Sequence, residues 1–273
     1  MSLTTPLSAA DQTVLHAGFL TALQRKAVIA SQTDRQYTGE ITGKGSSVKV
    51  ILPDLVTLAD YEPGVTVITP TAVSDSDVTL KVNQAKYWAV KLDDVVANAG
   101  AAGELDAVAA SAGDTTANVV DAHIASVWAA NAAIDLGTDV DLSAAGAAYE
   151  FLLDVVVKCA GKGSDRVAIV PTAFKAKLLL DSRFVGTGFT AQYNAQIGTV
   201  AGFAIVEDEY ATDTVLVRAH REAVASVVSL SKVERYRPES AFADAVKGLV
   251  LYGAKVIRPE AAGAGTVVFT PGP

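Results

Sequence analysis

The stretch GTGFTA, which begins at Gly186, has the glycine spacing of a dinucleotide-binding fingerprint. Such a fingerprint follows a strand and opens a helix, because the amino terminus of the helix then faces the pyrophosphate. Here the stretch follows DSRF, at the predicted end of a helix. We therefore interpret Gly186 and Gly188 as residues of a tightly turned loop. The alternative for these glycines is a small α/β nucleotide-dependent enzyme.

Other short motifs suggest phosphate binding or acyl transfer but lack the companions that this chemistry needs. GKGS occurs at Gly43 and at Gly161, and in neither copy does Ser or Thr directly follow the Lys, as a phosphate loop requires. Both copies are interpreted as turns. SLSK, from Ser229 to Lys232, is predicted to end a strand, whereas the serine-lysine acyl enzymes place it at the start of a helix.

The residues that could bind a metal or attack a substrate are scattered. His16, His123 and His220 fall on unlike predicted elements. The acidic stretch VEDEYATD lacks the ligand spacing of a calcium loop and is interpreted as a solvated turn. The single cysteine, Cys159, lies in an apolar helical run, which favours a buried, unreactive thiol. We expect no catalytic residue, no bound cofactor and no metal site.

Composition narrows the class of protein. Half of the 273 residues are hydrophobic, which is enough for a sizeable core. The net charge of −8 gives no general attraction to nucleic acid or to anionic lipid. We find no signal peptide and no apolar run long enough to span a bilayer. These features predict a soluble intracellular protein.

The first predicted helix begins near Ser8 and continues to Ile29. Leu15, Phe19 and Leu23 recur at every fourth position and form one apolar stripe. An aperiodic segment follows, so this helix has little local core to bury the stripe. We expect the stripe to pack against a neighbouring subunit or against the underside of the long helix described next.

Strand signals follow at Val48, Val65, Val78 and Tyr87, and we interpret them as hairpins. The first two strands enclose a long connection, PDLVTLADYEPG. At the tip of a projecting hairpin, its apolar residues would be an aggregation liability unless another subunit covers them. The residues concerned are Leu55, Val56, Leu58 and Tyr61.

One long helix is predicted to end at Asn131, and a mixed α/β region follows it. Ser143 is the predicted cap of a helix that ends at Gly161. RVAIVP is a buried strand, TAFKAKLLL a helix, and four further strands follow. The pattern predicts mixed α and β layers without regular βαβ repetition.

This order of elements resembles the major capsid proteins of tailed bacteriophages, the Hong Kong 97-like or Johnson fold. Locally the resemblance is carried by VAIVPTAFKAKLLLDSRFVG, IGTVAGFAIVEDE and ESAFADAVKGLVLYGAKVIRPEA, in the order that the family uses. It covers nearly the whole chain and implies an α+β fold with five parts. These are an N-terminal arm (1–44), the extended E-loop hairpin with flanking strands (45–91), a P-domain with a long spine helix (92–140, the helix from about Leu92), a mixed α/β A-domain (141–224), and strands that return to the P-domain and end in a C-terminal tail (225–273).

The resemblance also implies a function in assembly. Copies of the chain would form hexamers and pentamers of an icosahedral shell around double-stranded DNA, bound without sequence specificity. Portal protein, and scaffolding or decoration proteins, would be partners. No membrane would be involved. The shell would assemble in the host bacterial cytoplasm and be found in the virion. An encapsulin-like compartment around a cargo enzyme is the alternative within the same fold.

Overall fold

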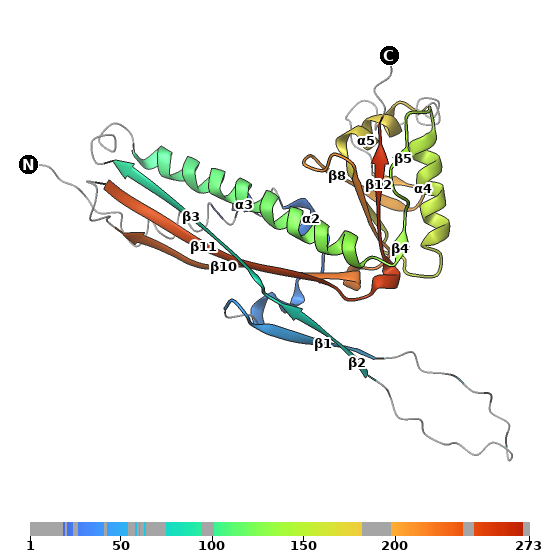
Figure 1. Cartoon of the computed structure of the whole chain (residues 1–273), viewed down its shortest axis with the longest axis horizontal. Coiled ribbons are helices and arrows are strands. Elements are labelled where there is room, and N and C mark those ends of the chain that lie inside the picture. The colour runs from blue at the N-terminus through green and yellow to red at the C-terminus, as the bar shows by residue number, and fades with distance from the viewer. Residues whose placement is uncertain are drawn as a thin grey trace, which may run out of the picture.

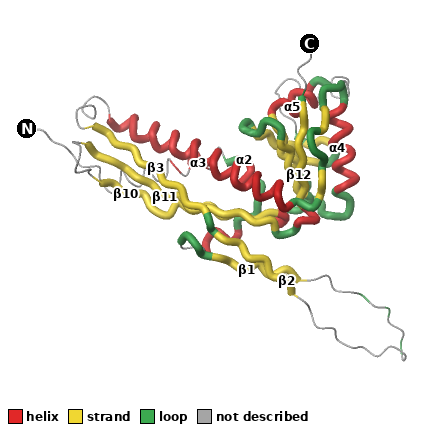
Figure 2. Tube along the Cα trace, viewed as in Figure 1, coloured by secondary structure: helices red, strands yellow, loops and turns green. Residues whose placement is uncertain are grey.

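The structure is a computed structural model, and it describes residues 19, 21–23, 27–40, 43–53, 58, 60, 63, 75–93, 101–181, 198–236 and 243–269. Figure 1 shows a long curved sheet with one long helix lying along it, a compact unit at one end, and a two-stranded arm that projects away from both. Figure 2 shows the same arrangement by type of secondary structure.

A three-stranded antiparallel sheet forms the long part of the molecule. β11 (Ala243–Val256) lies between β10 (Val224–Tyr236) and β3 (Gln84–Asp93). Along one face of it runs α3 (Ala101–Asn131), whose 31 residues span about 46 Å at 1.5 Å per residue. The predicted long helix is confirmed, but its expected start near Leu92 is wrong, because Leu92 pairs with Asp244 as part of β3.

The compact unit contains a seven-stranded sheet with helices α4 (Ala147–Lys158) and α5 (Thr172–Leu179) beside it. All five residues of its strand β6 (Val167–Pro171) are buried, as the continuous apolar run RVAIVP predicts. β6 lies parallel to β8 and antiparallel to β9. The other strands are β4 (Ile134–Asp135), β5 (Val140–Asp141), β7 (Thr199–Val200), β8 (Phe203–Asp208), β9 (Thr214–Arg218) and β12 (Ala262–Val268).

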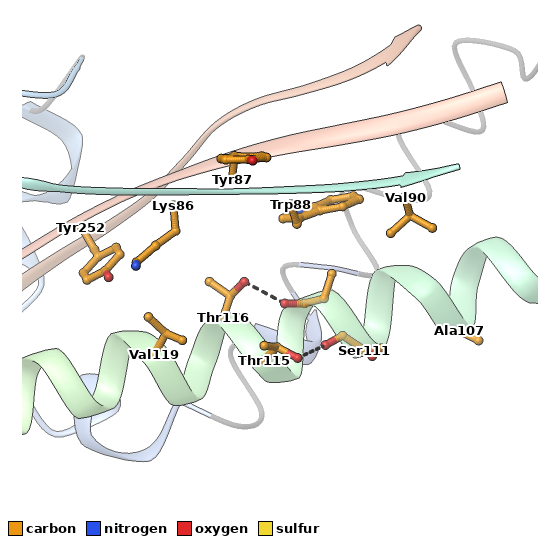
Figure 3. Close-up of a pocket in the computed structure, with 11 residues that line it drawn as sticks. Lys86, Tyr87, Trp88, Val90, Ala107, Ser111, Thr115, Thr116, Val119 and Tyr252 are labelled. Carbon is orange, nitrogen blue, oxygen red and sulfur yellow. Dashed lines mark hydrogen bonds between the residues drawn. The ribbon is translucent and has the colours of Figure 1, made fainter. Parts of the chain in front are cut away.

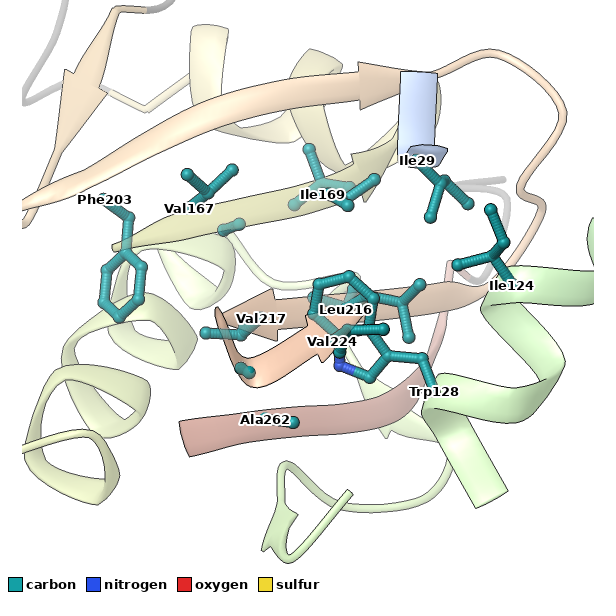
Figure 4. Packing of buried hydrophobic residues seen from close by; sticks show 14 of the residues in the cluster. Ile29, Ile124, Trp128, Val167, Ile169, Phe203, Leu216, Val217, Val224 and Ala262 are labelled. Carbon is teal, nitrogen blue, oxygen red and sulfur yellow. The ribbon is translucent and has the colours of Figure 1, made fainter. Parts of the chain in front are cut away.

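The hydrophobic core joins the long helix to the compact unit. Trp128 extends from α3 toward Leu216 and Val224, and Ile124 of the same helix lies near Ile29 (Figure 4). All five side chains are buried, and Trp128 is fully so. Within the described residues, no helix combines the length and the hydropathy needed to cross a bilayer.

The projecting arm consists of β1 (Ser47–Pro53) and β2 (Asp75–Lys81), paired antiparallel. The prediction that the first strand forms a hairpin with the segment at Val65 is wrong, because β1 pairs with β2. This pairing places apolar residues of both strands on one face, where they pack against β10 and β11. The cluster consists of Val48, Val50, Leu80, Val82, Ala225, Val227, Leu251 and Ile257. The segment at Val65 lies outside the described residues.

β2 and β3 are almost continuous, and they cross β11 at Gly253. A Cβ atom at Gly253 would overlap the backbone carbonyl of Lys81. Only a glycine allows the two backbones to approach so closely. Gly253 therefore determines where the arm leaves the long sheet.

The C-terminal segment forms β12 in the seven-stranded sheet, between β4 and β9. Residues 225–273, which we expect to return together to one domain and end in a tail, therefore divide between two sheets. The small residues of AAGAG explain this placement. A Cβ atom at Gly265 would lie 2.7 Å from the carbonyl oxygen of Gly137, so glycine permits the close approach.

Two predicted helix boundaries are also wrong. Ala27, with φ −74° and ψ 88°, is not helical, so the first helix does not continue unbroken to Ile29. The short helix α2 (Val28–Ser31) begins after it. α4 is preceded by Gly146, with φ 84°, instead of being capped by Ser143.

Candidate functional site

Asp121 on α3 ties the N-terminal segment to the long helix. Its carboxylate accepts hydrogen bonds from the backbone N–H of Ile29 at 3.1 Å and of Ala30 at 2.9 Å. Both amides belong to α2, whose N-cap residue Ala27 has no side-chain acceptor. A carboxylate 91 residues after Ala30 therefore supplies the cap that Ala27 cannot.

The environment of Asp121 makes its protonation sensitive to mildly acidic pH. Burial raises the pKa of the carboxyl group to about 6. The backbone hydrogen bonds from Ala30, Ile29 and Val28 oppose this rise, whereas the charge of Asp208 adds to it. Because the hydrogen bonds favour the charged form and burial favours the neutral one, the final value reflects their competition.

The same N-terminal segment is bonded to β10 on its other side. The hydroxyl groups of Thr33 and Ser226 lie 2.5 Å apart and are buried. The backbone N–H of Asp34 donates to the carbonyl of Val224, and that of Ser226 donates to the carbonyl of Asp34, both at 2.9 Å. Residues 27–34 are thus held by α3 and by the long sheet together.

Phe19 and Leu23, two members of the predicted apolar stripe, are buried within the chain. Phe19 stacks on the indole of Trp88, with ring centroids 5.9 Å apart. On α3, a Cβ atom at Gly113 would lie 2.9 Å from the carbonyl oxygen of Phe19 and 3.2 Å from the amide nitrogen of Leu23. Gly113 therefore admits this segment to the side of the helix. Leu15 lies outside the described residues, and a contact of the stripe with another subunit stays a prediction.

At the predicted hairpin tip, Leu58 is described and is 93% exposed. Leu55, Val56 and Tyr61 lie outside the described residues. An isoleucine on the outer face of the arm, Ile51, is also 64% exposed. The arm therefore carries apolar side chains that the described part of this chain leaves exposed.

A groove with a volume of about 560 Å³ lies between β3 and α3. Figure 3 shows Lys86, Trp88 and Val90 on the strand, and Ser111, Thr115 and Val119 on the helix. The ring of Trp88 also rests on Gly248, where a Cβ atom would overlap it. The sequence from Tyr87 to Leu92 predicts a strand but not this groove, which depends on the distance between β3 and α3.

The residues whose types could support catalysis or metal binding do not lie close to one another in the structure. His123 packs edge-on against Tyr252, with ring centroids 5.3 Å apart, and burial lowers its pKa. Its Nε2 atom has no hydrogen-bond partner, so it is a packing residue. Ser229 to Lys232 do not end a strand as expected, because they lie inside β10 at a β-bulge. Among the described residues, no group of His, Cys, Asp and Glu could hold a metal ion.

The remaining candidates have structural positions. Cys159 is buried at the end of α4, and burial raises the pKa of its thiol. The acidic stretch ends β8, where Glu207 pairs with Lys175 at 2.5 Å, and continues as the turn before β9, so only its second part is the predicted turn. Asp208 accepts a hydrogen bond from the N–H of Tyr210 at 3.0 Å. Gly161, with φ 74°, lies in a turn as expected, and GTGFTA lies outside the described residues.

Comparison with known proteins identifies the fold. No protein-family model matches the sequence, and none of the curated proteins matches it. Among solved structures, a chain from Mycobacterium phage Che8 is 24% identical, with a TM-score of 0.72, and the match covers 88% of this chain and 90% of that one. The capsid of cyanophage P-SCSP1u matches at 16% identity and a TM-score of 0.66, covering 84% and 85%. The mature capsid of bacteriophage PhiM1 matches at 15% identity and a TM-score of 0.62, covering 82% and 83%. The chain therefore has the mixed α+β fold of tailed-phage capsid subunits, as its resemblance to the Johnson fold implies.

Proposed function

We propose that the protein is the major capsid protein of a tailed phage, a structural subunit that assembles with copies of itself into an icosahedral shell. The observation that carries the proposal is the extent of the match to a phage chain, which covers 88% of this chain and 90% of the other. A match over nearly the full length of both chains points to a shared overall architecture. It therefore supports a common architecture of assembly.

The exposed apolar surface supports the same function. Leu58, Ile51 and Tyr87 are all more than half exposed and lie on the arm or on β3. Such a surface is costly for a protein that stays monomeric, because it favours aggregation. In a shell, neighbouring copies cover it and gain free energy from its burial.

The enclosed material in this proposal is double-stranded DNA, held without sequence-specific contacts. The net charge of −8 suits a container wall that does not bind a polyanion tightly. The portal protein, and scaffolding or decoration proteins, are the expected further partners. Assembly takes place in the host cytoplasm and the product is the virion capsid. We propose no catalytic centre.

Electron microscopy of the purified recombinant protein tests the proposal. Closed particles are the expected result, and a compact monomer that binds a nucleotide in calorimetry would overturn it in favour of the enzyme alternative. For particles from infected cells, the nucleic-acid content distinguishes a genome container from an encapsulin-like compartment. A DNA-free shell with a protein cargo and no portal vertex would support the compartment.

The arm offers a second test. Because Pro53 pairs with Asp75, an Asn-Gly turn can replace residues 54–74 and close the arm locally. We expect a folded monomer that forms no closed particles. A variant with a Gly/Ser segment of equal length in place of 54–74 is the control, because it separates chain length from the apolar side chains. Normal shells from both variants would show that the tip contributes nothing to assembly.

A further inference from the structure

The groove between β3 and α3 has the dimensions of a small-molecule binding site. Its volume of about 560 Å³ lies within the range of about 300–1,000 Å³ that such sites have. On α3, the first and last residues that line it are Ala107 and Val119. The helix between them spans about 18 Å at 1.5 Å per residue. The groove is therefore elongated, and an extended ligand suits it better than a compact one.

The walls of the groove are mainly apolar. Trp88 and Val90 line it from the strand, and Val119 lines it from the helix (Figure 3). Two threonines of the helical wall, Thr115 and Thr116, donate their hydroxyl hydrogen atoms to backbone carbonyl oxygens of α3, at 3.0 and 2.7 Å. Because these donors are already paired, a sugar or a nucleotide would leave many of its own polar groups without partners here. The walls favour a hydrocarbon chain.

One end of the groove is positively charged. The amine of Lys86 and the hydroxyl group of Tyr252 lie there, near Val119 (Figure 3). Lys86 is exposed and forms no ion pair with the described residues, and among the described residues that line the groove none is acidic. Burial raises the pKa of the Tyr252 phenol, so its hydroxyl group keeps its proton and can donate a hydrogen bond. A carboxylate can accept hydrogen bonds from both groups.

We propose that the groove binds a free alkyl carboxylate of the fatty-acid type, with its head group at Lys86 and Tyr252 and its hydrocarbon chain along α3 toward Ala107. The inference goes beyond the proposed function and does not depend on it, because the ligand binds a single chain. The chain as a whole has a net charge of −8, so it repels an anion in general, and the unpaired charge of Lys86 localises the head group.

Such a ligand covers apolar surface that the described part of the chain leaves open. Val119 is 39% exposed, and Trp88 and Val90 are partly exposed. Water leaves these side chains when a hydrocarbon chain lies against them, which favours binding. An occupied groove should therefore also reduce the aggregation of chains that have not assembled.

Isothermal titration calorimetry with dodecanoate tests the proposal, on chains separated from any particles by size-exclusion chromatography. Dodecanoate, below the concentration at which it self-associates, should bind saturably with a single site per chain. Dodecanol has the same hydrocarbon chain and a neutral head group. It should bind more weakly by about tenfold, because it has no charge to pair with Lys86.

Two pairs of variants locate the ligand. Lys86→Gln should weaken dodecanoate binding by about tenfold and leave dodecanol binding unchanged, whereas Lys162→Gln, at an exposed position outside the groove, should change neither. Ser111→Phe fills the groove and should weaken the binding of both ligands by about tenfold. Ser126→Phe, at an exposed position of α3 outside the groove, is its matched control and should change neither. Circular dichroism verifies that each variant is folded.

A brominated dodecanoate reports where the hydrocarbon chain lies. Bromine quenches the fluorescence of a tryptophan that it contacts, and the chain has two tryptophans. Trp88 lines the groove, whereas Trp128 is fully buried in the core. The brominated ligand should therefore quench the fluorescence of the native chain, and Trp88→Phe should abolish the quenching.

Absence of saturable binding overturns the inference. So does binding that neither Lys86→Gln nor Ser111→Phe weakens, because the ligand then adsorbs elsewhere on the chain. Binding that Ser111→Phe abolishes and Lys86→Gln leaves unchanged refutes the contact of the head group, since the groove then accepts any apolar ligand. Quenching that persists in Trp88→Phe places the ligand outside the groove and refutes the site. None of these results bears on whether the chains form a shell, which electron microscopy decides separately.

Discussion

The seven-stranded sheet and the three-stranded sheet differ in how much of their surface this chain covers. In the first, every residue of β6 is buried. In the second, β3 has a free edge among the described strands, and Tyr87 is 81% exposed. The described core of the compact unit is therefore covered within one chain, whereas the long sheet and its arm carry the surface that we propose other copies cover. In the proposed function, folding free energy and assembly free energy are therefore concentrated in different regions.

The largest expected effect comes from Trp128, which joins the two regions. It is fully buried and extends from α3 toward Leu216 of the seven-stranded sheet. Trp128→Ala should lower the free energy of unfolding of the monomer by about 3–5 kcal/mol, because it removes a large side chain and leaves a cavity. Denaturant unfolding followed by circular dichroism measures this loss.

Val157→Ala is the control for that experiment, because Val157 is 72% exposed on α4 and its truncation should change stability by less than about 0.5 kcal/mol. If Trp128→Ala costs no more than the control, the long helix does not depend on the compact unit. The long sheet with its helix and the compact unit would then be two domains that fold independently.

A smaller and local effect is expected at the cap of α2. Asp121→Ala leaves the N–H groups of Ile29 and Ala30 without their acceptor, which should cost about 1–3 kcal/mol at pH 7. Hydrogen exchange should accelerate at these two amides more than in β6 of the compact unit. Equal acceleration in both places would mean that the N-terminal segment and the compact unit unfold together.

The contribution of Asp121 to the stability of the folded chain should also depend on pH. Its folded pKa of about 6 lies above the usual value of 3.8, so the folded chain binds the proton more tightly than the unfolded chain. The stabilisation by this proton is complete below about pH 3.8 and is lost as pH rises through about 6. From pH 7 to pH 4.5 the group should therefore add on the order of 1–2 kcal/mol of stability.

Asp121→Asn isolates this contribution, because the amide does not titrate. Other carboxyl groups act in the opposite direction, such as Glu207, whose pKa is lowered by its hydrogen bond to Lys175. The difference in unfolding free energy between the native chain and the variant should grow toward acid pH. A difference that shrinks toward acid pH would reverse the assigned direction of the shift.

The smallest expected effect lies in the turn between β7 and β8. Ala201 has φ 49°, in the left-handed region that disfavours residues with a Cβ atom. Ala201→Gly should raise stability by up to about 1 kcal/mol. Ala204→Gly, in the extended strand β8, is the matched control and should lower it by about 0.5–1 kcal/mol. Thermal unfolding of both variants measures these changes. If both substitutions lower stability by a similar amount, the backbone at Ala201 is not strained.

Sequence periodicity predicts the long helix and most strands, because the spacing of apolar residues in each element reflects which of its faces are buried. It does not predict partners that are distant in the chain. The pairing of β1 with β2 depends on a register across 22 or more residues, and the hydrogen bond that the N–H of Ala30 donates to Asp121 spans 91 residues. A lone aspartate on a helix gives no signal of what it will bind.

The role of Gly113 shows the same limit. In sequence it is a residue that weakens a helix, whereas in the structure it is the point where Phe19 and Leu23 approach the helix. The groove beside β3 was missed for a similar reason. Trp88 and Val90 predict a strand, but the distance from that strand to α3 is a property of the assembled layers.

The crossing of β2 over β11 at Gly253 has a mechanical consequence. Beyond the crossing, the seven residues of β2 form a lever about 24 Å long. A rotation of about ten degrees at its base displaces the far end by about 4 Å, roughly the spacing of neighbouring strands. A side chain at Gly253 would have to displace the backbone of Lys81 and so alter this angle. In an array of copies linked through their arms, as the proposed function implies, a substitution at Gly253 should therefore change the curvature of the array.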